Sequence, residues 1–353
     1  MPAIEDSVLR DAMARRLYRG SVVTGEITIP AVPAMLDEYV HMCATLFGAV
    51  GRPFTEDQLE HLKTALEGQL AEAFSASPRS NIVISYNAPQ GTVLNYHINA
   101  QWFTVAGAYE NWTATREPPL FGTEPDARVM ALAHEVEDCG SYPILDIGAG
   151  TGRNALALAR LGHPVDVVEM TPAFANEIRT EAERDSLNVR VIERDVFTTI
   201  DDLRRDYQLI LLSEVVSDFR TTQQLRGLFE LAAQCLPPGG LLLFNAFVAH
   251  RDYVPDAAAR QLGQQSYTTI FTQDEFAYAS AALPLQLISD EPVYDYEKAN
   301  LRADAWPPTG WYEEWVSGLD VFDVPRERRP IELRWLVYRR MGPVRSTLPD
   351  YTP

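Results

Sequence analysis

Three glycines and one acid have the spacing expected of a nucleotide-binding site. Gly148, Gly150 and Gly152 separate an apolar run, which begins at Ile144, from a run with helical spacing. A second apolar run follows and ends at Glu169. Backbone N–H groups at a strand–loop–helix junction attract polar or anionic groups, and glycines let a ligand approach the backbone. An acid at the end of the second strand can accept hydrogen bonds from both hydroxyls of a ribose.

The position of the third glycine narrows the class of nucleotide. The dinucleotide fingerprint GxGxxG would place its third glycine where this chain has Arg153. No lysine follows that could complete a phosphate-binding GxxxxGK loop. The loop reads GxGxG instead, which excludes both of those patterns.

This loop and its surroundings resemble the class I S-adenosylmethionine-dependent methyltransferases. Their first motif is an apolar strand, an acid and GxGxG, which corresponds here to the stretch ILDIGAGTG with Asp146 as the acid. The resemblance continues with LPPGG (236–240) before a fifth strand and with a final strand, IELRWLVYRR (331–340). It covers about residues 124–250 together with the C-terminal strands.

The resemblance implies that S-adenosylmethionine is the methyl donor and S-adenosylhomocysteine the product. Glu169 would accept the ribose hydroxyls, and Asp195, with Val196 beside it, would receive the adenine amino group. The complete set of expected donor-binding residues is Asp146, Gly148, Ala149, Gly150, Gly152, Glu169, Met170, Asp195, Val196 and Ser213. Solvated acids at strand ends are the alternative interpretation of Glu169 and Asp195, and a capping role is the alternative for Asp146.

The catalytic residue is less constrained than the donor site. Methyl transfer from a sulfonium depends mainly on alignment of the nucleophile, and a general base is needed only where the acceptor must lose a proton. His250, which directly follows the fifth strand, is the first candidate, because an ordinary pKa of about 6.5 suits proton removal near neutral pH. Glu214, at the end of the fourth strand, is the second candidate, and Asp218 is a further alternative.

The acceptor is expected above the carboxyl ends of the fourth and fifth strands, as in the family. Aromatic and acidic residues are frequent in the segments that would close this region, which suits a planar or cationic acceptor. The candidates for contact with the acceptor are Tyr109, Trp112, Arg116, Phe247, Tyr253 and Trp311. The alternative is that such rings only pack the insert at 290–330 onto the sheet. Arg116 could also meet the carboxylate of the donor.

Charge and missing motifs weigh against nucleic acid as the acceptor. The net charge is −19 and no strong basic cluster is present, whereas a nucleic-acid binder carries a basic face. The sequence SEVV (213–216) stands where D/N-P-P-Y/F would indicate methylation of an amide or adenine nitrogen. We therefore expect methyl transfer to an O or N atom of a small molecule. A peptide or protein methyltransferase and a non-catalytic scaffold with this fold are the alternatives, and no metal is expected.

The elements that would position these residues alternate between strand and helix from about residue 124 to residue 250. Apolar strands separated by helices predict an α/β fold with a doubly wound, Rossmann-like sheet of seven strands, the last of them antiparallel. Before this sheet, helical spacing at 34–50, a capping box at Thr55 and Gln58, and a hairpin at 81–98 predict an α+β extension.

Composition and pattern suggest two domains. Residues 1–120 would form a lid, a recognition domain or a dimerisation domain, which leaves a homodimer open, and residues 121–353 would form the methyltransferase domain with its insert at 290–330. With 46% hydrophobic and 22% charged residues, the chain has the composition of an ordinary folded protein. No apolar run approaches the ~20 residues that span a membrane, and the N-terminus lacks the layout of a secretory signal, so a cytoplasmic location is expected.

Overall fold

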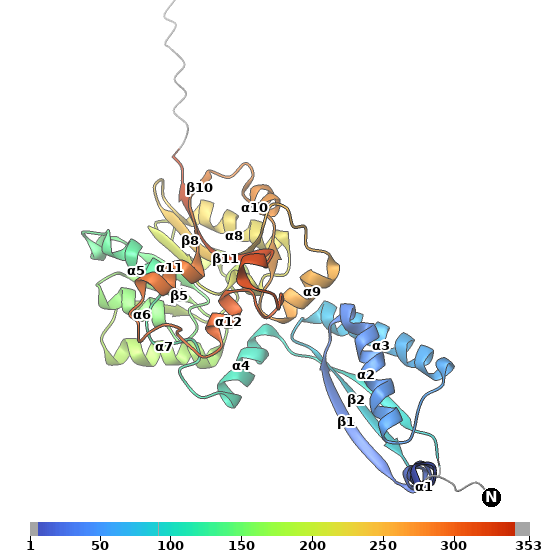
Figure 1. The fold of residues 1–353 in the computed structure, drawn as a ribbon. Helices are drawn as coiled ribbons and strands as arrows, with labels where there is room; N and C mark the ends of the chain where they lie inside the picture. The colour runs from blue at the N-terminus through green and yellow to red at the C-terminus, as the bar shows by residue number, and fades with distance from the viewer. Residues whose placement is uncertain (1–5, 91, 343–353) are drawn as a thin grey trace, which may run out of the picture. The chain divides into compact units, whose positions relative to one another are not determined.

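The computed structural model describes residues 6–90 and 92–342, apart from the side chain of Arg19, and these residues form two compact units (Figure 1). The first unit ends at Ala108 and the second begins at Tyr109. This division precedes the boundary at residue 120 that the sequence suggested. The reason is that Tyr109 and Trp112 pack against rings of the second unit.

The first unit combines a three-stranded antiparallel sheet with two helices that cover it. Its elements in chain order are α1 (Asp6–Gly20), β1 (Val23–Pro30), η1 (Pro33–Met35), α2 (Leu36–Ala49), α3 (Glu56–Ala76), β2 (Asn81–Ala88) and β3 (Asn95–Gln101). The sheet order is β1-β2-β3, which confirms the hairpin expected at 81–98 and adds β1 to it. Its core contains Phe47 of α2, Leu62, Leu66 and Leu70 of α3, and Ile82 and Ile84 of β2.

The second unit is built on a sheet of eight strands. These are β4 (Ile144–Ile147), β5 (Val165–Val168), β6 (Val189–Ile192), β7 (Leu209–Leu212), β8 (Leu241–Ala249), β9 (Ile270–Phe271), β10 (Leu285–Pro292) and β11 (Ile331–Arg340). The main order is β10-β11-β8-β7-β4-β5-β6, and β9 pairs with β8 outside that path. Strands β4 to β8 are parallel, and β11 is antiparallel to β8 and β10. The predicted Rossmann-like sheet with an antiparallel last strand is therefore confirmed.

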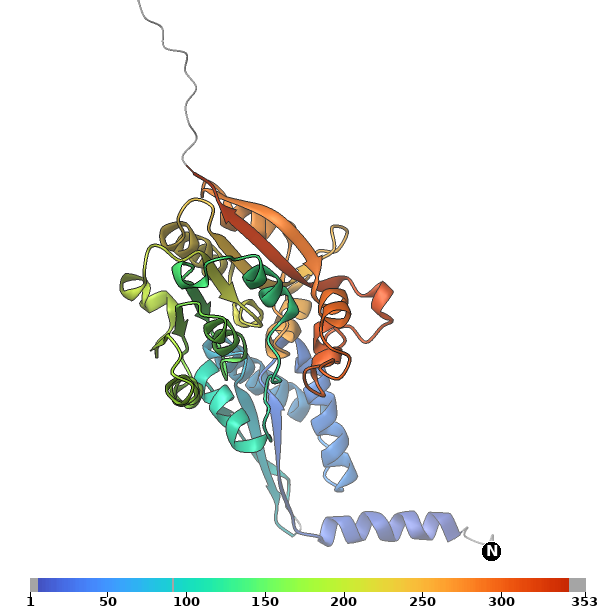
Figure 2. The same cartoon turned by 90° about the vertical axis from the view of Figure 1, so that its left-hand side faces the viewer.

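Helices cover both faces of this sheet. They are α5 (Ala127–His134), α6 (Arg153–Arg160), α7 (Pro172–Arg184), α8 (Thr222–Cys235), α9 (Ala257–Gln265), α10 (Gln273–Ser280), α11 (Val293–Asn300) and α12 (Tyr312–Val316), whereas the division between the two units falls within α4 (Val105–Thr115). Residues of α5, α6, α7, α11 and α12 belong to the core on one face, and residues of α8 and α10 to the core on the other. Figure 2 shows the long β10–β11 pair at the edge of the sheet, with the helices of residues 293–316 beside one end of it. Within residues 6–90 and 92–342, no helix has both the length and the apolar character needed to cross a membrane.

Three of the parallel strands, β4, β5 and β7, are short and covered on both faces. β4, β5 and β7 are buried at every position and read ILDI, VDVV and LILL. Because the strands are parallel neighbours, their carboxyl ends meet at one edge of the sheet, which is where ligands bind in folds of this kind. Two short 3-10 helices follow strands at this edge, η3 (Val196–Thr198) after β6 and η5 (Val216–Asp218) after β7.

Two helices begin with capping boxes, one of which is the box predicted at Thr55 and Gln58. At the start of α3, Gln58 N donates to Thr55 Oγ1 at 3.3 Å, and Thr55 N donates to Gln58 Oε1 at 2.9 Å. Thr272 and Glu275 form the same reciprocal pair at the start of α10. Each box satisfies two backbone donors that a helix N-terminus would otherwise leave without a partner.

Replacing Thr55→Ala is expected to destabilise the first turn of α3 by about 1 kcal/mol, because the N–H of Gln58 loses its acceptor. Hydrogen exchange of the α3 amides measures the change. The matched control is Glu72→Ala, an exposed substitution on the same helix, which should leave these exchange rates as they are. Equal effects of the two substitutions would contradict the capping role of Thr55.

Candidate active site

The glycine loop between β4 and α6 has a backbone that few residues other than glycine adopt. Gly148, Gly150 and Gly152 have φ angles of 68°, 56° and 86°, in the left-handed region. A Cβ atom on Gly148 would lie 2.5 Å from Cγ2 of Val215, and one on Gly152 would lie 2.9 Å from Cγ1 of Ile178. Backbone conformation and packing therefore both require glycines at this spacing.

Glu169, which follows β5, is tied to the glycine loop. Its Oε2 accepts a hydrogen bond from Gly150 N at 3.0 Å, and its Oε1 accepts one from Thr171 N at 2.8 Å. Burial raises the pKa of this carboxyl, and the two N–H groups oppose that rise. Because each carboxylate oxygen can accept more than one hydrogen bond, the side chain keeps capacity for ligand hydroxyls while it fixes the loop.

Asp146 lies inside β4, two residues before the first glycine of the loop. Its side chain is buried, and its Oδ2 has no hydrogen-bond partner among the described residues. Burial raises the pKa of this carboxyl from its ordinary value of 3.8 to about 7; Asp126 adds to the rise and Arg153 opposes it. A buried polar atom without a partner is uncommon in folded proteins, so this oxygen marks a place where a polar group of a ligand could bind.

The remaining donor candidates lie at the same edge of the sheet. Asp195 follows β6, and its Oδ1 accepts a hydrogen bond from Phe197 N at 2.8 Å, which caps η3. Met170 follows β5 and is 39% exposed, whereas Ala149 and Val196 are half-buried. Because β4, β5 and β6 are neighbours in the sheet, the loops that carry these residues are neighbours as well.

Beside the loop lies a buried group of charges that the sequence did not reveal. Arg153 is the first residue of α6, and its side chain is 7% exposed. Its Nη1 lies 2.7 Å from Oδ1 of Asp126, and its Nη2 lies 2.6 Å from Oε1 of Glu214. The hydroxyl of Ser213 donates to Oδ2 of Asp126 at 2.6 Å. The one sign of this group in the sequence was a basic residue directly after the third glycine.

These contacts change the interpretation of Glu214 and Ser213. The carboxylate of Glu214 is engaged by Arg153, and the hydroxyl of Ser213 by Asp126. Burial raises the pKa of Glu214 to about 7, and Arg153 opposes the rise. A general base needs a lone pair that the acceptor can reach, so Glu214 is a weaker candidate for that role than its position in the sequence suggested.

Six aromatic rings gather against the glycine loop. This ring cluster consists of Tyr109, Trp112, Phe121, Phe174, Tyr267 and Trp311, whose neighbouring ring centroids are 5.2–6.3 Å apart. A Cβ atom on Gly150 would lie 3.2 Å from the Phe121 ring. The cluster therefore extends from the loop to the insert, which contributes Trp311.

Two polar features lie at the ring cluster. The hydroxyl of Tyr109 donates to Oδ2 of Asp218, the last residue of η5, at 2.7 Å. The guanidinium carbon of Arg116 lies 3.8 Å from the centroid of the Trp112 ring. The structure thus brings together the acceptor candidates Tyr109, Trp112, Arg116 and Trp311, and adds Asp218 to them.

The other acceptor and base candidates are placed differently. Phe247 is fully buried and packs edge-on against Trp315, with centroids 5.3 Å apart, so its ring is part of the core on that face of the sheet. Tyr253 is half-buried and packs edge-on against a ring of the insert at 5.7 Å. His250 is exposed after β8, where its N–H donates to Pro330 O at 2.9 Å.

Tyrosine rings of the insert already contact cations of the chain itself. Arg326 lies 4.0 Å and Lys298 4.9 Å from the centroid of the Tyr294 ring. Arg128 lies 5.3 Å from the centroid of the Tyr296 ring. Cation–π contacts with the chain's own Arg326, Lys298 and Arg128 therefore help to hold these two rings in place.

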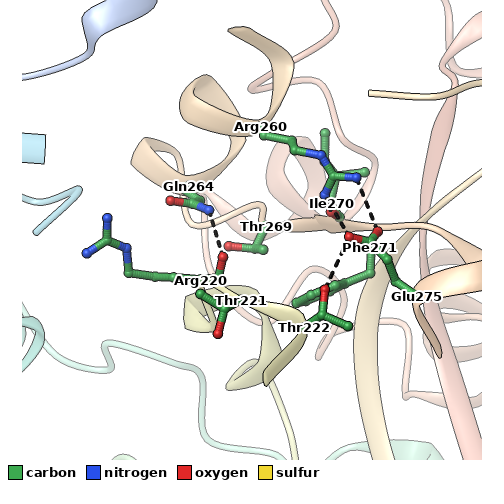
Figure 3. A pocket seen from close by; sticks show the side chains of 9 residues that line it. All are labelled: Arg220, Thr221, Thr222, Arg260, Gln264, Thr269, Ile270, Phe271 and Glu275. Atoms are coloured by element: carbon green, nitrogen blue, oxygen red, sulfur yellow. Dashed lines mark hydrogen bonds and ion pairs between the residues drawn. The ribbon is translucent and has the colours of Figure 1, made fainter. Parts of the chain in front are cut away.

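A cavity of about 230 Å³ borders the segment after β7 (Figure 3). It is lined by Arg220, Thr221, Thr222, Arg260, Gln264, Thr269, Ile270, Phe271 and Glu275. Arg260 turns its guanidinium toward Glu275 at 3.2 Å, whereas the side chain of Arg220 runs away from the other lining residues (Figure 3). Thr269 N donates to Ser217 O at 3.3 Å, which joins the cavity to η5. No sequence motif marked this cavity.

Among known proteins, one family model matches the part of the chain that contains the glycine loop. A family model described as a methyltransferase domain matches residues 144–240, from β4 to the turn before β8. A search of curated proteins found no match.

Several solved structures resemble the fold at low sequence identity. Geranyl diphosphate C-methyltransferase from Streptomyces coelicolor A3(2) is 16% identical, with 61% of this chain and 78% of that chain covered and a TM-score of 0.48. An O-methyltransferase segment of StiE is 16% identical, with 61% and 73% covered and a TM-score of 0.43. The (4+2)-cyclase SpnF is 15% identical, with 68% and 98% covered and a TM-score of 0.48. We draw no conclusion about the acceptor from similarity of this degree.

The substitution Gly150→Ala is expected to weaken binding of S-adenosylmethionine by at least about tenfold, because a Cβ atom would press on Phe121 and strain a φ of 56°. Calorimetric titration with S-adenosylmethionine and S-adenosylhomocysteine measures the loss. Gly239→Ala is the matched control, since its φ of 93° is also positive but the space around its Cβ position is open. Equal weakening in the control would mean that general strain, and not the loop, caused the effect.

The substitution Asp146→Asn is expected to change how stability depends on pH. Because burial raises the folded-state pKa from 3.8 to about 7, the folded protein holds a proton that the unfolded chain has already lost between these values. This carboxyl therefore lowers stability progressively as pH rises from about 4 to about 7. The free energy of unfolding of the variant minus that of the wild type should rise over this range and stay constant above it.

Urea unfolding at a series of pH values measures this difference. Asp274→Asn, which changes an exposed carboxyl on α10, is the matched control and should show no such rise. A difference between Asp146→Asn and wild type that is independent of pH would show that Asp146 is ionised in the folded protein throughout the range.

Proposed function

We propose that this chain, a class I S-adenosylmethionine-dependent methyltransferase, transfers the methyl group to an O or N atom of a small planar acceptor held at the ring cluster. The observation that carries the proposal is the hydrogen bond between Tyr109 and Asp218 at that cluster. The Tyr109 ring lies 6.3 Å from the Phe121 ring, which in turn lies against Gly150. An acceptor beside Tyr109 and Asp218 would thus be one aromatic ring away from the glycine loop.

The donor would be held by the glycine loop and by acids at the ends of β5 and β6. The loop N–H groups and the N-terminus of α6 suit polar groups of the donor, and Glu169 keeps acceptor capacity for the ribose hydroxyls. Asp195 would receive the adenine amino group, with Met170 and Val196 beside the base. Asp146 would meet a polar group with the oxygen that has no partner among the described residues. The bound sulfonium supplies a methyl group that is already activated for transfer.

The ring cluster favours an acceptor that is itself planar. Trp112 lies 5.2 Å from Tyr267 and 6.1 Å from Trp311, so a planar acceptor bound here would pack against aromatic rings. Holding the acceptor nucleophile in line with the methyl group supplies most of the rate acceleration in such a reaction. A phenol or an aromatic amine combines a flat ring with an O or N nucleophile and fits this wall.

Asp218 is the acid best placed to accept a proton from the acceptor. A carboxylate has about four acceptor sites, so Asp218 can bind Tyr109 and an acceptor hydroxyl at the same time. Glu214 is engaged by Arg153 at 2.6 Å, and His250 is exposed beyond β8, which makes both weaker candidates. For an amine that already has a free lone pair, Asp218 would orient the acceptor without removing a proton.

The cavity next to η5 gives room for a polar substituent of the acceptor. Its volume of about 230 Å³ is below the range of about 300–1,000 Å³ that is typical of pockets for drug-sized ligands. Threonines, a glutamine and the Arg260–Glu275 pair provide most of its polar lining. Small size and polar character support part of a small molecule as the occupant more than a peptide chain.

The substitution Asp218→Asn is expected to lower kcat for a phenolic acceptor by about 100-fold, because it removes the proton acceptor and keeps the shape of the side chain. Formation of S-adenosylhomocysteine at saturating donor is measured across a panel of phenols and aromatic amines. The Kd for S-adenosylhomocysteine should stay that of the wild type. Asp252→Asn, which changes an exposed acid after β8, is the matched control and should keep full turnover.

The same assay separates the alternatives. Unchanged turnover in Asp218→Asn would contradict the role of Asp218 as proton acceptor. Turnover with peptides, and with none of the small molecules, would move the acceptor to the peptide class. Donor binding without turnover on either class would favour a scaffold that binds the donor only.

A further inference from the structure

The buried guanidinium of Arg153 joins three segments that are far apart in the sequence. Asp126 precedes α5, Arg153 begins α6 and Glu214 follows β7. Besides its contact with Arg153, Asp126 exchanges two hydrogen bonds with Asn154, from Asp126 N at 2.9 Å and from Asn154 Nδ2 at 2.8 Å. Ser213 donates a further one at 2.6 Å. The two acids that neutralise Arg153 are therefore themselves held in place.

Glu214 has a backbone conformation that its residue type avoids. Its φ is 62°, and a non-glycine residue keeps such an angle only where its surroundings hold it there. Asn245 Oδ1 accepts a hydrogen bond from Glu214 N at 2.7 Å. Arg153 holds the carboxylate at 2.6 Å. Glu214 is thus held at its backbone and at the end of its side chain.

What Glu214 fixes is the turn at 213–218, which we call the β7 turn. Val215 in this turn packs on Gly148 so closely that a Cβ atom on the glycine would lie 2.5 Å from Cγ2 of the valine. The turn ends with Asp218, which accepts the hydrogen bond from the Tyr109 hydroxyl. The β7 turn therefore touches the glycine loop at one point and presents Asp218 to the ring cluster at another.

The insert contributes to the same arrangement through Glu297 of α11. Its carboxylate is fully buried and accepts hydrogen bonds from Ala127 N at 2.7 Å, Arg128 N at 3.2 Å and Trp335 Nε1 at 2.9 Å. Ala127 directly follows Asp126 in the chain. The insert thereby fixes the start of α5 and, with it, the acid that pairs with Arg153.

We infer that Arg153 is a positioning residue for methyl transfer, which pairs with Asp126 and Glu214 to fix the β7 turn to the glycine loop and so sets Asp218 relative to the donor. The role of Asp218 in this inference rests on the proposed function, whereas the pairing does not. A buried ion pair adds little stability on balance, because desolvation of the two charges offsets their attraction. The planar guanidinium instead fixes the relative positions of its two partners, because it can bind two carboxylates at once in a defined geometry.

A purely structural role for Arg153 predicts different behaviour. In that case its replacement would lower the stability of the whole second unit and leave turnover of the folded protein as it is. Positioning predicts the reverse, a local opening of the β7 turn and a loss of turnover in protein whose other strands stay protected. Hydrogen exchange and steady-state kinetics on the full chain separate the two.

The test variant is Arg153→Lys, which keeps the charge but replaces the fork with one ammonium group that reaches one carboxylate at a time. We expect the exchange of amides 213–218 to rise at least about tenfold and kcat to fall at least about tenfold, while the amides of β8 keep their protection. Arg160→Lys is the matched control on the same helix, since Arg160 pairs with Asp185 at 2.7 Å on the surface. This control should change neither exchange nor kcat.

Glu214→Gln is the second variant and keeps the test decisive if Arg153→Lys folds poorly. It retains the length of the side chain and one oxygen for Arg153, so its loss of kcat should be smaller than that of Arg153→Lys, with the same amides affected. Exchange of 213–218 at wild-type rates in both variants overturns the inference. A rise that is equal in β8 and in the β7 turn also overturns it, as does an opened turn with unchanged kcat.

Hydrogen exchange is measured without any ligand. It therefore reports the pairing of Arg153 with Asp126 and Glu214 whether or not an acceptor is known. A wild-type protein that turns over no acceptor would defeat the proposed function and not the pairing. The exchange of the β7 turn then decides by itself whether Arg153 fixes this turn to the glycine loop.

Discussion

A guanidinium that is buried beside a backbone loop must have anionic partners, and this requirement organises the site. Arg153 follows the last glycine of the loop, and its partners come from the segment before α5 and from the turn after β7. Each acid is held by further hydrogen bonds to Asn154, Ser213 or Asn245. The contacts around Arg153 therefore connect the segment before α5, the start of α6, the turn after β7 and strand β8. The glycine loop is therefore bordered by segments that these contacts hold in place.

More carboxyl groups than guanidinium groups are buried in the region around Arg153. Burial raises the pKa of Asp146, Glu214 and Glu297 to about 7 each, and Arg153 opposes this rise at Asp146 and Glu214. A cation that binds nearby favours their ionised forms, and a neutral ligand does not.

Features that depend on local pattern could be predicted from the sequence, and features that depend on distant contacts could not. The glycine loop, the parallel strands and the capping boxes each lie within a short stretch whose spacing determines them. In the sequence Asp126 is an unremarkable acid and Glu214 is a candidate base, because nothing there marks Arg153 as the partner that both share. The carboxyl end of β8 pairs with β9 and β11, which lie later in the chain, and no local pattern marks these partners.

The place of β11 in the sheet has a consequence for how the chain is made. This strand lies between β8 and β10 although it follows both in the sequence. Until residues 331–340 have been synthesised, one edge of β8 has no partner, and this strand is buried along almost its whole length in the finished sheet. An unpaired apolar edge is where chains associate wrongly. The second unit can thus complete its sheet only after residues 331–340 have been synthesised.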